Sequence, residues 1–245
     1  MKISMKISGK NKLEGKKNKV IKSTNLIIID ASGSMGSKIE DVKGGLKQIL
    51  EDIKKDAQKD KGKKEIQTIV LDFSDARDIR TLVNTKDCKH LEPNMADGYS
   101  VRGSTALFDA IGKGFSMVDS NDKNVFVSII TDGGENASRE FSGHAIKQLI
   151  SEKRERGWAI TFMGTDEQAI EQARSFGITS GNTFMFANNS AGVSLSMNKV
   201  LKSRKMSYSA AGGQGFGSEG ADLKYRGSVG TDAMENLLKE EDDNS

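Results

Sequence analysis

One apolar segment of the chain ends abruptly in a run of oxygen-bearing side chains. Residues 26–29 read Leu-Ile-Ile-Ile, and Asp30, Ser32 and Ser34 follow them in the pattern Asp-x-Ser-x-Ser. The apolar run is typical of a buried strand, which would deliver one carboxylate and two hydroxyls to its carboxyl end. These are hard oxygen ligands of the kind that Mg²⁺ prefers. The pattern therefore favours a divalent-cation site at the end of this strand.

Two later segments contain further oxygen ligands. Residues 102–111 contain Thr105 at an expected helix start, and residues 125–134 form a second apolar strand that ends in Asp132 and two glycines. Together with the Asp-x-Ser-x-Ser run, they resemble the von Willebrand factor type A domain and its metal-ion-dependent adhesion site. The resemblance covers roughly residues 24–206 and fills all five positions of the motif. The metal ligands that it implies are Asp30, Ser32, Ser34, Thr105 and Asp132.

The resemblance also implies how this site works. Mg²⁺ is the expected ion, with Mn²⁺ or Ca²⁺ as alternatives. Neutral hydroxyls of Ser32, Ser34 and Thr105 would face it, while Asp30 and Asp132 act largely through water and hydrogen bonds. The metal then stays electrophilic, and its open position favours a carboxylate from an Asp or Glu of a partner protein. We therefore expect a protein-binding module and not an enzyme.

Two other functions remain open at this stage. A structural or assembly protein, for example a phage virion component, would make the metal secondary. A metal-dependent hydrolase is less favoured, because neither His90 nor His144 is placed by a motif as a base. Residues 33–38 have the wrong spacing for a phosphate-binding loop, and Ser34 lacks the first glycine of a nucleophile elbow. A phosphatase of the Asp-x-Asp type would need a second carboxylate at Ser32.

Several other polar residues lie near the expected ligands in the sequence. Asp109 follows Thr105 by one helical turn, and it either anchors the ligand loops or is an exposed helix residue. Asp72 ends another strand near the same edge and is interpreted as a structural loop residue. Glu135 and Asn136 follow Asp132, and we expect them at the rim of the site.

The remaining pattern alternates strands with helices, which predicts an α/β fold with a mostly parallel sheet covered on both faces. The resemblance adds the strand order 3-2-1-4-5-6 of a doubly wound, Rossmann-like sheet, with residues 79–83 as one antiparallel edge strand. In such sheets ligands bind at the carboxyl ends of strands beside the topological switch point. Strands are expected at 26–30, 66–73, 79–83, 124–131, 158–163 and 183–186, and helices after 38, at 106–118, before 157, at 168–176 and around 193–201.

Composition divides the chain into three parts. Residues 1–22 contain eight lysines and one acid and are expected to form a basic arm. Residues 23–206 are the expected von Willebrand factor type A domain. Residues 207–245 are rich in glycine and predict a flexible tail. No aromatic residue lies among the lysines of the arm, so we do not expect nucleic acid as a partner.

Charge and cysteine content bear on location. The net charge is +3, which is too small to imply a polyanionic partner by itself. Cys88 is the only cysteine, and no apolar run is long enough for a membrane span or a signal peptide. We therefore expect a cytoplasmic protein that is not anchored in a membrane. The resemblance is greatest to small stand-alone bacterial and phage members of the family, which makes the virion the alternative location. The oligomeric state is left open.

Overall fold

The computed structural model describes residues 20–59, 64–122, 124–165, 167–178, 182–185 and 192 of the 245-residue chain. The expected last helix around 193–201, the tail 207–245 and residues 1–19 of the basic arm lie outside these residues. None of the helices in the described ranges combines the length and apolarity that a bilayer crossing needs.

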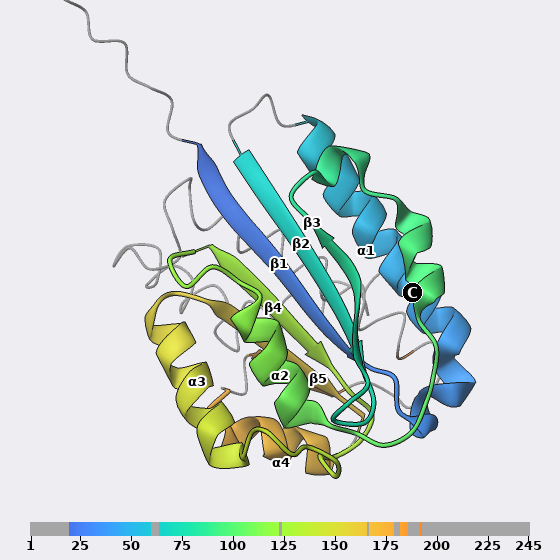
Figure 1. Ribbon diagram of the computed structural model, residues 1–245, viewed down its shortest axis with the longest axis vertical. Helices are drawn as coiled ribbons and strands as arrows, with labels where there is room; N and C mark the ends of the chain where they lie inside the picture. Colours follow the sequence, from blue (N-terminus) through green and yellow to red (C-terminus); the bar gives the residue numbers. More distant parts are fainter. Residues whose placement is uncertain are drawn as a thin grey trace, which may run out of the picture.

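In the described part of the chain, six strands form one sheet (Figure 1). They are β1 (Ile21–Asp30), β2 (Lys64–Phe73), β3 (Ile79–Thr85), β4 (Val125–Ile130), β5 (Ala159–Gly164) and β6 (Thr183–Met185). Their order is β3-β2-β1-β4-β5-β6, with antiparallel pairing only between β2 and β3. The predicted strand order and the single antiparallel edge strand are therefore confirmed.

Strand β1 is longer than its apolar run indicated. It begins at Ile21 instead of Leu26, which places its first two residues in the segment assigned to the basic arm. Its polar first half still pairs with β2 from Ile21 onward and with β4 from Thr24 onward. Asn25 is buried and donates to the Thr68 hydroxyl at 3.4 Å. Backbone pairing extends this strand beyond its apolar run, so the hydrophobic pattern alone did not reveal where the strand begins.

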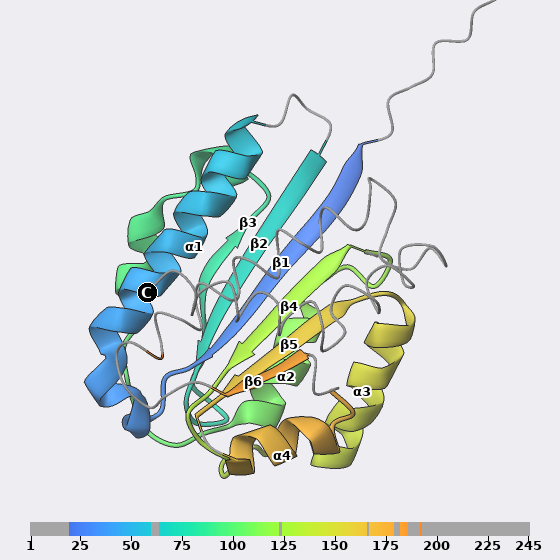
Figure 2. The same cartoon turned by 180° about the vertical axis from the view of Figure 1, so that it is seen from behind.

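Helices cover both faces of the sheet (Figures 1 and 2). The longer helices are α1 (Ile39–Lys59), α2 (Leu107–Ser116), α3 (Gly143–Glu155) and α4 (Glu167–Ser175). The short 3₁₀ helices of the described ranges are η1 (Gly33–Lys38), η2 (Cys88–His90) and η3 (Pro93–Gly98). Helix α1 packs on one face together with η2 and η3, whereas α2, α3 and α4 contribute to the core on the other.

The central strand β1 is buried from both sides, which explains its continuous apolar run. Ile27 and Ile29 point into the core beneath α1, and Leu26 and Ile28 point into the core beneath α2. Strand β4 lies beside β1 with Ile29 opposite Ile130. Because the two strands are parallel, the residues that follow them emerge at the same edge of the sheet.

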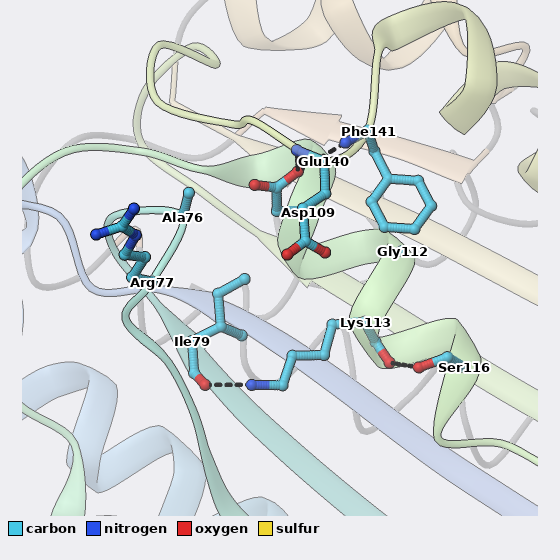
Figure 3. A pocket seen from close by; sticks show the side chains of 9 residues that line it. All are labelled: Ala76, Arg77, Ile79, Asp109, Gly112, Lys113, Ser116, Glu140 and Phe141. Carbon is cyan, nitrogen blue, oxygen red and sulfur yellow. Dashed lines mark hydrogen bonds between the residues drawn. The ribbon is translucent and has the colours of Figure 1, made fainter.

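Helix α2 approaches its neighbours closely through a glycine. A Cβ atom at Gly112 would lie 2.4–2.6 Å from carbons of the Phe141 ring, which packs directly against the helix (Figure 3). Gly44, on the exposed side of α1, has no atom within 4 Å of such a Cβ position. Both glycines lie in helices, but only Gly112 is crowded, so Gly44 serves as its control.

We predict opposite effects for alanine at these two glycines. Gly112→Ala should lower the free energy of unfolding by about 1–3 kcal/mol, because the phenyl ring must move. Gly44→Ala should raise it by roughly 0.5–1 kcal/mol, because alanine loses less conformational entropy in a helix. Urea unfolding of both variants measures the difference. Equal effects of the two substitutions would contradict the close packing of Phe141 on α2.

Candidate metal centre

Asp30 lies at the end of β1, fully buried, with both carboxylate oxygens accepting hydrogen bonds. Its Oδ1 accepts from the backbone N–H of Ser32 at 2.7 Å, and its Oδ2 accepts from the Thr131 hydroxyl at 2.6 Å. The hydroxyl of Tyr99, also buried, donates to the backbone oxygen of Asp30 at 2.7 Å. Asp30 therefore joins the loops that follow β1 and β4.

A second chain of hydrogen bonds connects the serines to Asp132. The Ser32 and Ser34 hydroxyl oxygens are 3.0 Å apart, and the Ser34 hydroxyl donates to Asp132 Oδ1 at 2.5 Å. Asp132 Oδ2 accepts from the ammonium of Lys38 at 2.6 Å. Asp30 bonds to Ser32, Ser32 to Ser34, and Ser34 to Asp132. These contacts bring together four of the five predicted ligand residues.

Thr105, the fifth predicted ligand residue, is held by its backbone. Its N–H donates to Asn136 Oδ1 at 2.9 Å, and its carbonyl accepts from the N–H groups of Asn136 and Ala137. Its side chain lies near Gly133, where a Cβ atom would be 3.8 Å from the threonine hydroxyl oxygen. Thr105 is only 4% exposed, yet its hydroxyl has no hydrogen-bond partner among the described residues.

These residues fit a divalent ion that prefers oxygen. The spacing of 3.0 Å between the Ser32 and Ser34 oxygens matches neighbouring ligands of an octahedral Mg²⁺ ion, which lie about 2.8–3.0 Å apart for bonds of about 2.0–2.1 Å. The Thr105 hydroxyl makes no hydrogen bond to the described residues, so its oxygen is available to a ligand. Ser34 is exposed, so the cluster is open to solvent on that side. No group of three or more His, Cys, Asp or Glu residues lies close enough together in the described ranges to hold a metal.

Burial dominates the electrostatics of Asp30. It raises the pKa of this carboxyl from 3.8 to about 6, although hydrogen bonds from Thr131 and Ser32 favour the ionised form. The negative charge of Asp132 raises the pKa further, as the smaller effect. A bound cation would favour the ionised carboxylate, so metal affinity should fall as the pH drops below about 6.

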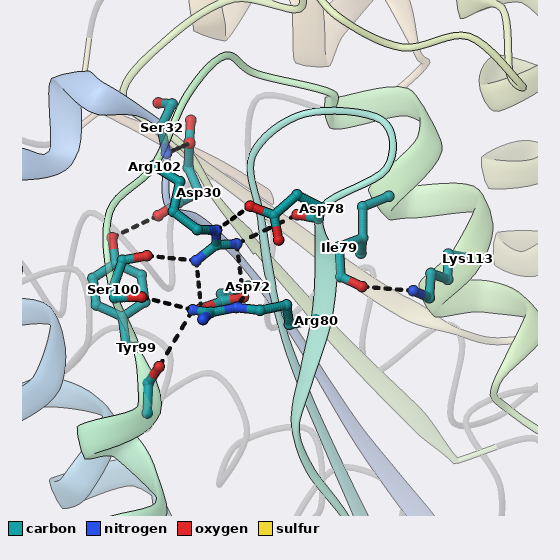
Figure 4. Close-up of polar contacts among 11 residues, drawn as sticks. Asp30, Ser32, Asp72, Asp78, Ile79, Arg80, Tyr99, Ser100, Arg102 and Lys113 are labelled. Carbon is teal, nitrogen blue, oxygen red and sulfur yellow. Dashed lines mark hydrogen bonds and ion pairs between the residues drawn. The ribbon is translucent and has the colours of Figure 1, made fainter.

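An ion-pair network around the buried Asp72 holds the loop before Thr105 (Figure 4). Asp72, at the end of β2, has no exposed surface and accepts hydrogen bonds from Arg80 and Arg102 on both oxygens. Arg102 also pairs with Asp78, and its backbone N–H donates to the carbonyl of Ala31 at 2.7 Å. The network therefore connects β2 and β3 to the loops of Ser32 and Thr105. Asp72 is structural, as interpreted, but it lies within a strand and not in a loop.

Asp109 anchors the loop that follows Asp132 (Figure 3). It is buried on α2, where Oδ1 accepts from the N–H groups of Glu140 and Phe141 and Oδ2 accepts from Arg139. Of the two alternatives for this residue, the anchoring role is confirmed. Its contacts order the segment behind the metal ligands and do not reach them.

Glu135 and Asn136 serve the same loop in different ways. Asn136 holds Thr105 through the hydrogen bonds described above. Glu135 was expected at the rim of the site, but the structure shows it half-buried. Its carboxylate accepts hydrogen bonds from the N–H groups of Phe108 and Ala137. A carboxylate at the start of α2 also complements the positive end of the helix dipole.

Sequence reasoning missed three residues that the structure places in or behind the cluster. Tyr99 and Arg102 lie in the long connection between β3 and α2, where no periodicity or motif marks them. Lys38 follows Ser34 by four residues, and this spacing on a helical turn was the available signal. Its ammonium also donates to the backbone oxygen of Ser34 at 3.0 Å.

We predict that Asp30→Asn stabilises the metal-free protein in a pH-dependent way. The pKa in the folded state is about 6, above the ordinary 3.8, so the wild-type carboxyl costs stability as the pH rises through this interval. At pH 7.5 in chelator the variant should gain up to about 3 kcal/mol in the free energy of unfolding. At pH 4 the gain should vanish, because the folded wild type is then protonated.

Urea unfolding at the two pH values measures this effect. Glu171→Gln, at an exposed carboxylate of α4, is the control and should change the unfolding free energy little at either pH. A gain for Asp30→Asn that is as large at pH 4 as at pH 7.5 would contradict the role of burial.

We predict that Asp72→Asn weakens both the fold and the site. The charged hydrogen bonds to two arginines become weaker, which should cost about 1.5–3 kcal/mol in the free energy of unfolding. Asp97→Asn breaks an exposed pair with Lys47 and should cost less than about 1 kcal/mol. Cation titration of folded Asp72→Asn should show weaker binding than Asp97→Asn, and equal affinity would contradict the coupling of this network to Thr105.

Comparison with known proteins agrees with this geometry. The family model of the von Willebrand factor type A domain matches residues 26–199. No curated protein matches the chain. Among solved structures, proximal thread matrix protein 1 from the mussel byssus aligns with a TM-score of 0.52 and 18% identity, over 74% of this chain and 45% of that chain. The chain thus spans less than half of the length of that protein.

Two further structures show the same fold. The vWF domain of the type V pili tip protein Mfa5 from Porphyromonas gingivalis aligns with a TM-score of 0.59 and 11% identity, covering 77% of this chain and 96% of that chain. A structure of the mussel protein with a zinc-occupied MIDAS motif gives a TM-score of 0.52 and 18% identity, with coverage of 76% and 46%. Since the family model matches well over half of its residues, the chain belongs to the von Willebrand factor type A domain family.

Proposed function

We propose that this protein binds one divalent cation, with Mg²⁺ as the expected ion, and uses it to bind an Asp or Glu carboxylate of a partner protein. Ser32, Ser34 and Thr105 would hold the ion, with Asp30 and Asp132 acting through hydrogen bonds and water. The contacts that bring Ser32, Ser34 and Asp132 together, with the Thr105 side chain beside Gly133, carry this proposal. A bound dication would supply an electrophilic centre for an incoming oxygen ligand.

The state of the carboxylates favours binding over catalysis. A general base needs a basic oxygen within reach of the proton that it removes, and hydrogen bonds donated to a carboxylate make it less basic. Asp30 and Asp132 accept hydrogen bonds on both oxygens, and so do Asp109 and Glu135 behind them. The four carboxylates around the cluster therefore serve to position other groups.

A solved structure supports a divalent metal at this motif. The mussel byssus protein has a form whose MIDAS motif is occupied by zinc, so that related site accepts a divalent cation. The Mfa5 domain belongs to a pilus tip protein. We extend these properties to this chain as a proposal, together with the expected cytoplasmic location and its virion alternative.

A metal contact alone would give weak binding. Association must first offset several kcal/mol of lost translational and rotational freedom. Ser34 is exposed at the cluster, and the loops after Ser34, Gly103 and Asp132 surround it. We propose that these loops form the rest of the partner surface and set its specificity.

We predict that cation binding depends on Ser34 and not on its neighbour Ser37. Both serines are exposed on η1, but only Ser34 contacts Asp132. Titration with Mg²⁺ or Mn²⁺ should show at least tenfold weaker binding for Ser34→Ala, loss of binding for Asp30→Ala, and wild-type affinity for Ser37→Ala. Equal affinities of the two serine variants would overturn the ligand assignment.

The same variants test the partner. Wild type immobilised in Mg²⁺ should retain a host protein that chelator releases, and Ser37→Ala should retain it while Ser34→Ala does not. Replacing the partner's essential Asp or Glu by the amide should abolish this retention. Equal retention in chelator would favour a structural or assembly role, and turnover of a phosphate or peptide substrate by the isolated protein, lost in Asp30→Ala, would favour a hydrolase.

A further inference from the structure

Lys38 places a positive charge inside the proposed metal cluster. It is the last residue of η1, and only 2% of its side chain is exposed. Its ammonium donates to Asp132 Oδ2 at 2.6 Å and to the backbone oxygen of Ser34 at 3.0 Å. One flexible side chain therefore brings a cation to two of the five residues of the proposed site, Asp132 and Ser34.

This position is unfavourable for a lysine apart from these contacts. Helix α1 begins at the next residue, Ile39, and the amino end of a helix carries partial positive charge. Burial further disfavours an ammonium, because it removes the charge from water. The carboxylate of Asp132 offsets both effects. The lysine and the aspartate thus depend on each other, and each would be a buried unpaired charge without the other.

We propose that Lys38 is a tethered cation that neutralises Asp132 in the absence of metal, and that a divalent ion must displace it. This inference rests on the proposed function. Asp30 and Asp132 together carry two negative charges when ionised, and Lys38 neutralises one of them. A dication beside Ser34 would repel the ammonium, because both are positive and both are attracted by Asp132.

The chain provides a route for this exchange. Ser34 is exposed, so the cluster has a side open to solvent, and the lysine side chain is long and flexible enough to move its charge towards water. Metal binding is then an exchange of one cation for another, and the affinity for the metal is lower than the oxygen ligands alone would give. The metal-free protein remains folded because the ammonium replaces the ion.

Lys38→Met tests the exchange, because methionine keeps an unbranched apolar stem and removes the charge. Lys43→Met is the matched control: this lysine lies in α1, pairs at 3.7 Å with exposed Glu40 and makes no contact with the cluster. Calorimetric titration with Mg²⁺ should give at least tenfold tighter binding for Lys38→Met than for wild type. Lys43→Met should bind with wild-type affinity.

Thermal unfolding gives a second readout. In chelator the melting temperature of Lys38→Met should fall by about 5 °C or more, because Asp132 loses its counter-charge. Saturating Mg²⁺ should restore it, so that the metal-induced shift exceeds that of wild type. Lys38→Gln, which retains a neutral hydrogen-bond donor, should change both quantities in the same direction.

The outcomes separate this inference from the proposed function. Binding tightened by tenfold or more in either folded variant supports the exchange. A smaller increase in Mg²⁺ affinity, or a decrease, overturns the role of Lys38 but does not contradict the proposed metal site. No Mg²⁺ or Mn²⁺ binding by wild type and variants alike overturns both. Failure of both variants to fold even in saturating Mg²⁺ also overturns the exchange, since the ion should then replace the ammonium.

Discussion

Two buried carboxylates at the ends of adjacent parallel strands, Asp30 after β1 and Asp132 after β4, impose the main constraint on this protein. Neither is exposed to solvent enough to rely on water, and buried charges are stable only with hydrogen bonds or opposite charge. The loops around them supply these partners: a backbone N–H and a hydroxyl for Asp30, and a hydroxyl and an ammonium for Asp132. The conformation of the ligand loops follows from this requirement.

A second set of buried acids holds these loops from behind. Asp72 accepts from two arginines, one of which also bonds the loop after β1, and Asp109 accepts three backbone N–H groups of the loop after β4. Neither acid contacts the cluster directly. Such supporting contacts decide how closely a site keeps its geometry. The backbone of Thr105 is fixed in the same way by Asn136, which leaves its hydroxyl without a bond to the described residues.

The sequence predicted much of this arrangement. Continuous apolar runs at 26–29 and 125–130 indicated strands buried on both faces, and the resemblance added the strand order that the structure confirms. The sequence also predicted the ligand residues, because their types and their positions after strands can be recognised without a structure. They are the Asp-x-Ser-x-Ser run, Thr105 and Asp132. The start of β1 was wrong by five residues, because its first half is mostly polar and is held by backbone pairing with β2 from Ile21 and with β4 from Thr24.

What the sequence by itself determined is therefore the sheet, its order and the oxygen atoms offered at its carboxyl edge. The strands and the oxygen atoms follow from local periodicity and from the termini of single strands, whereas the order follows from the resemblance that the motif carries. Tertiary structure alone decided how those atoms are engaged: Lys38 meets Asp132 across 94 positions of the chain, and Tyr99 meets Asp30 across 69. Hydrogen bonds and ion pairs of this kind act over a few ångströms in space and leave no periodic signal, so only the folded chain reveals them.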